Sequence, residues 1–100
     1  MTREERDYAY TRFISEYGKK PQIDMCIEEM SELTKALLKY GRAAREDLLE
    51  ARDNIIDEIA DVKIMCEQME FIFDSKKEVE QRIDFKINRQ ISRLNNKKRK

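Results

Sequence analysis

The spacing of apolar residues along this chain is the feature that most restricts its fold. Four stretches place apolar residues every three or four positions, which is the spacing of one face of an α-helix. In 100 residues there are only two glycines and one proline, and they fall at the ends of these stretches rather than inside them. So few helix-breaking residues among so many Glu, Lys, Leu and Ile predict an all-α protein.

Capping signals indicate where the helices begin and end. Thr2, followed three residues later by Glu5, is the pattern of a capping box that opens a helix. Gly18 and Gly41 follow the first and second periodic stretches, where glycine commonly ends a helix. Ser75, followed by Glu78, marks the start of the last helix. The sequence therefore predicts helices over residues 3–17, 21–40, 47–73 and 75–95.

Short connections between these helices predict that neighbours run antiparallel, so we expect a four-helix antiparallel bundle. Residues 1–96 would form a single helical domain, and residues 97–100 a frayed basic tail. The apolar faces are wider than one chain needs. We therefore expect the bundle to oligomerise through them, as a homodimer or a homotetramer.

Charge is balanced overall but unevenly distributed. The chain has 21 basic and 21 acidic residues, yet the last eight, Arg93–Lys100, carry five positive charges and no negative ones. Residues 1–92 therefore have a net charge of −5 (16 basic minus 21 acidic). An acidic body with a basic tail is not the profile of a dedicated nucleic-acid binder, so we do not expect nucleic acid as a partner. The alternatives for the tail are solubility or weak, salt-sensitive binding to RNA or DNA.

Other function classes are excluded by what the sequence lacks. It shows no signal peptide and no apolar run approaching twenty residues, so we expect a cytoplasmic protein without membrane association. Cys26 and Cys66 lie in apolar stripes and are expected to be reduced core residues. The chain has no histidine, which excludes Ser-His-Asp and Cys-His catalysis and His-based zinc sites.

Two pairs of acidic residues provide the strongest functional signal. Glu29 and Glu32 are three residues apart, as are Glu58 and Asp61, so each pair shares one face of its helix. If the two helices pack together, four carboxylates meet, and their repulsion calls for a cation. Mg²⁺ prefers oxygen ligands, so we predict a magnesium site. The alternative is that these are solvated surface residues that arose by chance in an acid-rich chain.

The residues around both pairs resemble those of a known family. The run EEMSE at 28–32, followed after a spacer by EIAD at 58–61, resembles the EExxE…ExxD pattern of the MazG-like, all-α nucleoside triphosphate pyrophosphohydrolases. The resemblance covers about residues 20–95. It implies that a (d)NTP is hydrolysed at the α-phosphate to a (d)NMP and pyrophosphate. It also implies which residues bind Mg²⁺, or Mn²⁺ as its substitute, namely Glu29, Glu32, Glu58 and Asp61.

Within this resemblance, Glu28 is the candidate for the base that orients the attacking water, with simple solvation as the alternative. On the predicted fourth helix, Arg82, Lys86, Arg89 and Arg93 recur at steps of four, three and four and form one basic face. We expect Lys86 and Arg89 to bind the β- and γ-phosphates. The alternative is a solvated charged face.

Base recognition is assigned to amide side chains near the acidic pairs. Gln22 precedes Glu29 by one to two turns, and Asn54 precedes Glu58 by one turn. Both amides are candidates for binding the edge of the base, and ordinary packing is the alternative for each. For the whole chain, the alternative function is a non-enzymatic helical interaction or scaffold protein on the same fold.

Overall fold

A computed structural model describes residues 1–98 of the chain. Within these residues it contains four α-helices, one short 3₁₀ turn and no strands, which confirms the all-α prediction. No helix in this part is long and apolar enough to span a bilayer. In chain order the elements are α1 (Arg3–Tyr17), α2 (Lys19–Gly41), η1 (Arg45–Asp47), α3 (Leu48–Ile72) and α4 (Lys76–Lys98).

The first two helices begin and end close to the predicted positions. The Thr2 hydroxyl accepts a hydrogen bond from the Glu5 backbone N–H at 3.0 Å, and the Glu5 carboxylate accepts one from the Thr2 N–H at 3.3 Å, which completes the predicted capping box. Gly18 separates α1 from α2 with a φ of 94°, a value that side-chain-bearing residues rarely adopt. Helix α2 begins two residues earlier than predicted because Pro21 is tolerated in a first turn, where its missing N–H is not needed.

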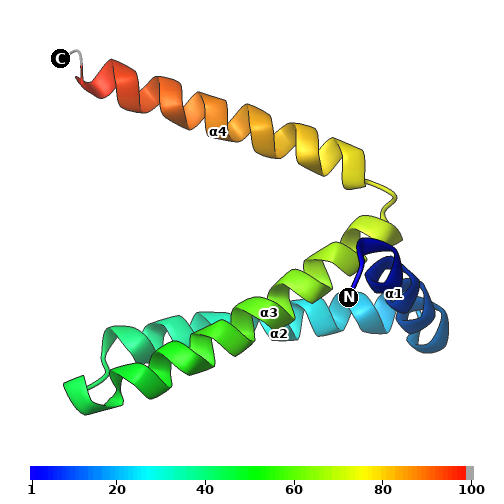
Figure 1. Cartoon of the computed structure of the whole chain (residues 1–100), viewed down its shortest axis with the longest axis horizontal. Coiled ribbons are helices and arrows are strands. Elements are labelled where there is room, and N and C mark those ends of the chain that lie inside the picture. The colour runs from blue at the N-terminus through cyan, green and yellow to red at the C-terminus, as the bar shows by residue number, and fades with distance from the viewer. Residues whose placement is uncertain (99–100) are drawn as a thin grey trace.

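Helices α2 and α3 form an antiparallel hairpin, and α1 lies across one end of it (Figure 1). The ring of Tyr10 in α1 packs edge-on against Phe71 in α3, with 6.1 Å between centroids. Arg3 and Arg6 form ion pairs with Glu67, which tie α1 to α3. The core is small, and its buried apolar side chains are Tyr10, Cys26, Ala51 and Met65.

One buried polar contact sets the register of α2 against α3. The Gln22 Nε2 donates to the Gln68 Oε1 at 2.7 Å, and the two residues are 7% and 2% exposed. The Gln68 Nε2 in turn lies 3.5 Å from the Met65 Sδ, which accepts its hydrogen bond. A buried amide without a hydrogen-bond partner destabilises the folded state. Sliding one helix along the other would break this hydrogen bond, so the contact favours the observed register.

The two cysteines differ in their environments. Cys26 on α2 is buried, as predicted, and burial raises the pKa of its thiol, with a smaller contribution from Cys66. Cys66 on α3 is exposed, so its prediction as a core residue was wrong. Its thiol is nevertheless close enough to Cys26 to contribute to that shift, so Cys66 lies at the edge of the hairpin interface and not inside it.

Helix α4 leaves the hairpin instead of packing along it (Figure 1), and within the described residues it approaches α3 alone, near the connecting turn. In that turn Asp74 has a φ of 47°. Its N–H donates to the Phe71 carbonyl at 3.2 Å, and the Ser75 N–H donates to the Glu70 carbonyl at 3.0 Å. This is the hydrogen-bond pattern of a Schellman motif. Residues 1–98 of one chain thus do not close a four-helix bundle, which stays a prediction about an assembly.

The end of α4 differs from the prediction. The helix continues through Lys98, so Lys97 and Lys98 belong to it and not to a frayed tail. No glycine or proline stops the helix earlier, and positive side chains near a helix C-terminus interact favourably with the helix dipole. Arg99 and Lys100, the rest of the predicted tail, lie outside the described residues.

Candidate metal centre

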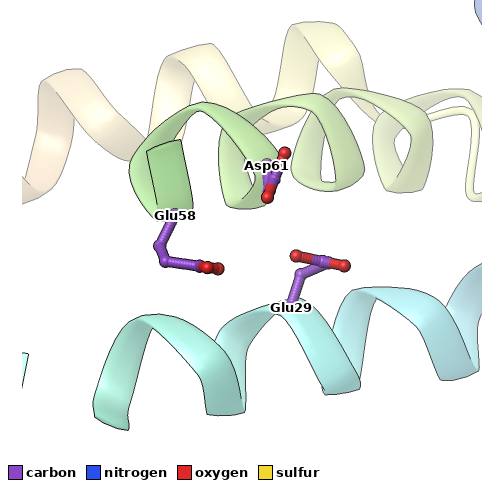
Figure 2. Close-up of side chains that lie close together, drawn as sticks. All are labelled: Glu29, Glu58 and Asp61. Carbon is purple, nitrogen blue, oxygen red and sulfur yellow. The ribbon is translucent and has the colours of Figure 1, made fainter. Parts of the chain in front are cut away.

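Three carboxylates from two helices converge near the middle of the hairpin. Glu29 of α2 and Glu58 and Asp61 of α3 each provide an oxygen, and these oxygens lie within 4.8 Å of one another. Figure 2 shows the three side chains directed toward the same space between the helices. The spacing of three residues places Glu58 and Asp61 on one side of α3, and antiparallel packing places Glu29 opposite them. The structure therefore brings together three of the four predicted metal ligands.

The group is partly shielded from water and short of positive charge. Glu29 and Glu58 are half-buried, whereas Asp61 is exposed. The Glu58 Oε2 is buried and has no hydrogen-bond partner among the described residues. Burial, followed by the negative charges of Asp61 and Glu32, raises the pKa of Glu58. Burial, followed by the charges of Asp61 and Glu58, likewise raises the pKa of Glu29.

This arrangement fits a hard divalent cation. All the donors are carboxylate oxygens, the ligand type that Mg²⁺ and Mn²⁺ prefer. In a Mg²⁺ octahedron opposite ligands are about 4.2 Å apart and neighbouring ligands about 3 Å apart, so the carboxylates would have to rotate inward for oxygens that lie within 4.8 Å of one another to bind one ion. A cation would also supply the partner that the buried Glu58 Oε2 lacks.

Glu32, the fourth predicted ligand, lies beside this group rather than in it. Its side chain is exposed, and its Oε1 accepts a hydrogen bond from Lys35 Nζ at 3.3 Å. The i,i+3 spacing on α2 favours this ion pair. Glu32 is nevertheless close enough to Glu58 to raise its pKa.

An open pocket of about 240 Å³ adjoins the carboxylates, and its walls contain both charges and small side chains. Asn54, one of the predicted base-binding residues, lines it. Lys39 and Asn54 also line a second pocket, of about 550 Å³, at the α2–α3 connection. Two small side chains, Ala36 on α2 and Ala51 on α3, are in the wall of the first pocket. The residues lining the first pocket are Glu32, Lys35, Ala36, Lys39, Ala51, Asn54 and Glu58.

Lys35 and Arg42 are cations near the site that the sequence interpretation did not single out. Lys35 lines the first pocket, and Arg42 lines the second with Lys39. Lys39 lies two turns after Glu32 on the same side of α2, and this spacing makes it a weaker phosphate-binding candidate from the sequence alone. Arg42 lies beyond the last residue of α2, where helical periodicity makes no prediction.

The remaining predicted residues are not gathered at the carboxylates. Gln22 is buried and its amide is used by Gln68, so the structure gives it a packing role. Lys86 and Arg89 lie on α4, away from the hairpin's acidic group (Figure 1), and Arg89 Cζ is 5.8 Å from the centroid of the Phe85 ring. Glu28 is exposed on α2, immediately before Glu29.

Comparisons with known proteins give no assignment, since no family model, curated protein or solved structure matches the chain. The resemblance to the MazG-like family therefore rests on the sequence of residues 28–32 and 58–61 and its helical context alone.

Proposed function

We propose that this chain is a Mg²⁺-dependent nucleoside triphosphate pyrophosphohydrolase, which converts a (d)NTP and water to a (d)NMP and pyrophosphate. The observation that carries the proposal is the convergence of Glu29, Glu58 and Asp61 around a buried carboxylate oxygen without a partner. When bound there, Mg²⁺ or Mn²⁺ would neutralise charge on the phosphate oxygens and lower the pKa of the attacking water.

The carboxylates would act from fixed positions on packed helices. Glu29, Glu58 and Asp61 hold the cation, and Glu32 lies near enough to join them if it leaves Lys35. Glu28, exposed beside Glu29, would orient the water and accept its proton. Attack on the α-phosphorus depends on positioning and on stabilisation of charge more than on a covalent intermediate, so this chemistry does not need the histidine that the chain lacks.

The pocket beside the carboxylates would receive the rest of the nucleotide. Lys35 and Lys39 line it and would neutralise phosphate charge, because ammonium groups are common phosphate ligands. The Asn54 amide lines the same pocket and is the better placed of the two predicted base-binding residues. The role predicted for Lys86 and Arg89 requires α4 to pack along a hairpin, whereas within residues 1–98 of one chain α4 contacts only α3, near the connecting turn.

The enzyme would act in the cytoplasm as a homodimer or homotetramer. The large apolar side chains left exposed on α2, α3 and α4 support assembly. The same surface supports the alternative function, a helical interaction or scaffold protein without activity.

Pyrophosphate release from a panel of NTPs and dNTPs, measured with Mg²⁺ and with EDTA, tests the proposal. We expect Mg²⁺-dependent release with a monophosphate product. Glu58→Gln should abolish it, whereas Glu46→Gln, the same change at an exposed position in η1, should not. Release from none of the nucleotides, with the helical circular dichroism spectrum intact, would refute the enzymatic function and leave the scaffold.

A further inference from the structure

Two contacts between α2 and α3 define which residues of the two helices lie at the same level of the hairpin. At one end, Gln22 of α2 donates to Gln68 of α3 at 2.7 Å. At the other end, oxygens of Glu29 on α2 and Asp61 on α3 lie within 4.8 Å of each other. The step from the first contact to the second is seven residues on both helices. The antiparallel register is therefore constant over this section of the hairpin (Figure 1).

Both cysteines of the chain lie inside this section. Cys26 comes four residues after Gln22, and Cys66 comes two residues before Gln68. In this register the two cysteines are offset by about 3 Å along the helix axes. The axes of packed helices are about 8–10 Å apart, with Cα atoms about 2.3 Å from each axis. Neighbouring Cα atoms across the interface thus come within the distance of about 7 Å that a disulfide can span.

The two thiols lie near each other but differ in their access to solvent. Cys26 is 5% exposed inside the α2–α3 interface, whereas Cys66 is exposed at its edge. Burial raises the pKa of the Cys26 thiol, and Cys66 is close enough to add to this effect. Both thiols are free. An exposed thiol beside a buried one is the arrangement of a cysteine that reacts with oxidants and a second cysteine that resolves the product.

We propose that Cys26 and Cys66 form a reversible disulfide in response to peroxide, which ties α2 to α3 beside the candidate metal centre. The chain has no other cysteine, so each is the only disulfide partner that the other has within one chain. Disulfides in a reducing compartment are usually transient and redox-sensing, which agrees with two cysteines that are free in the resting protein. The bridge does not depend on the chain having enzymatic activity.

Peroxide supplies the oxidising equivalents in two steps. The Cys66 sulfur attacks one oxygen of hydrogen peroxide, so an S–O bond forms, the O–O bond breaks, and the departing hydroxide leaves as water with the thiol proton. The Cys26 sulfur then attacks the Cys66 sulfur, so the S–S bond forms and the S–O bond breaks. The released hydroxide takes the Cys26 proton and leaves as a second water. Two thiols lose two electrons and two protons, and peroxide is reduced to two water molecules.

The bridge would close a loop that contains the hairpin connection and the acidic group. The step from Cys26 to Cys66 is forty residues, and Glu29, Glu58 and Asp61 all lie within it. A disulfide stabilises a fold chiefly by restricting the unfolded chain. The oxidised hairpin should therefore melt at a higher temperature than the reduced one, and the helices that carry the carboxylates could not separate until the bridge is reduced.

Mass spectrometry of the full chain after native treatment with hydrogen peroxide tests the proposal. We expect the mass to fall by two hydrogen atoms, and no thiol to react with iodoacetamide after denaturation. Peptide mapping without reductant should link the Cys26 and Cys66 peptides, and dithiothreitol should restore both thiols. Oxidation should raise Tm by about 10 °C. The protein concentration must be kept fixed, because assembly also changes Tm.

The matched controls each replace one thiol with a hydroxyl. In Cys26→Ser, Cys66 should stop at the sulfenic acid, which dimedone traps, and in Cys66→Ser the buried Cys26 should stay reduced. Peroxide should raise Tm in neither variant. A Cys66–Cys66 link between two copies, further oxidation of Cys66 while Cys26 stays free, or a bridge that leaves Tm unchanged would overturn the proposal. If a variant does not fold, the peptide map and Tm of wild type decide alone.

Discussion

The hydrogen bond between Gln22 and Gln68 allows a stability prediction to be worked out from the structure. Replacing Gln68 with leucine conserves volume but removes the acceptor, which leaves the buried Gln22 amide unpaired. An unpaired buried polar group costs about 1–3 kcal/mol. In a chain of about this length 1 kcal/mol changes Tm by about 4–8 °C, so Gln68→Leu should lower Tm by about 10 °C.

The reverse change, Gln22→Leu, should be similarly destabilising because it leaves the Gln68 Oε1 unpaired. The double variant removes both polar groups and should recover most of the loss, since replacing both partners with apolar groups is nearly neutral. Gln81→Leu on the exposed surface of α4 is the control for the same chemical change, and its effect should stay within about 0.5 kcal/mol.

Thermal unfolding followed by circular dichroism measures all of these variants. One protein concentration must be used throughout, because assembly makes Tm depend on concentration. The two single losses should not add in the double variant. If they add, or if neither single variant is destabilised, the two amides are not coupled and the register argument fails. If the stable double variant keeps activity, Gln22 has no role in base binding.

Three further predictions follow from the site, the cysteines and the turn. In metal-free protein, Glu58→Gln should raise Tm at pH 7, because burial raises the pKa of Glu58 and the folded chain disfavours the charged carboxylate. This increase in Tm should shrink as the pH falls toward 4.5, the ordinary pKa of glutamate. An increase that grows on acidification would contradict the prediction. A thiol reagent should modify Cys66 faster than Cys26, because Cys26 is buried and the pKa of its thiol is raised. Peptide mapping by mass spectrometry measures the two rates, and equal rates would contradict the prediction. Asp74→Ile should lower stability by about 1–2 kcal/mol because a φ of 47° is unfavourable for a β-branched residue, whereas Asp74→Gly should be tolerated; equal Tm values for the two would contradict the turn geometry.

The parts of the fold that depend on neighbouring residues could be predicted from the sequence. Thr2 and Glu5 form a capping box from contacts between residues only three apart, and Gly18 ends a helix because of its own backbone freedom. The convergence of Glu29, Glu58 and Asp61 could be predicted as well, because helical spacing and antiparallel pairing together determine which side chains face each other.

The finer details of the site could not be predicted in this way. Spacing shows that Glu29 and Glu32 share one face of α2. It does not decide whether the Glu32 side chain joins the acidic group or forms an ion pair with Lys35, because these are two conformations of the same side chain. The exposure of Cys66 likewise depends on how far the α2–α3 interface extends. An apolar stripe in the sequence shows which residues can be covered, but not which helix covers them.

The direction of α4 depends on a single backbone conformation. A short connection predicts an antiparallel neighbour only when the turn reverses the chain. Here Asp74 adopts a left-handed conformation, for which aspartate is a much weaker sequence signal than glycine. Once α4 points outward, the same apolar residues along it that predict a bundle support the proposed assembly of copies.

The candidate metal centre and the α4 surface therefore differ in what they require. Glu29, Glu58 and Asp61 all belong to the α2–α3 hairpin of one chain, so the candidate cation site takes none of these three carboxylates from a second copy. The variant Ile83→Asp/Ile87→Asp places two charges among the exposed apolar residues of α4 and should be monomeric. It should then bind Mn²⁺ with an affinity close to that of wild type in isothermal titration calorimetry, even if activity is lost. A variant that remains helical but no longer binds Mn²⁺ would contradict this separation, because it would show that a partner chain holds the carboxylates in place.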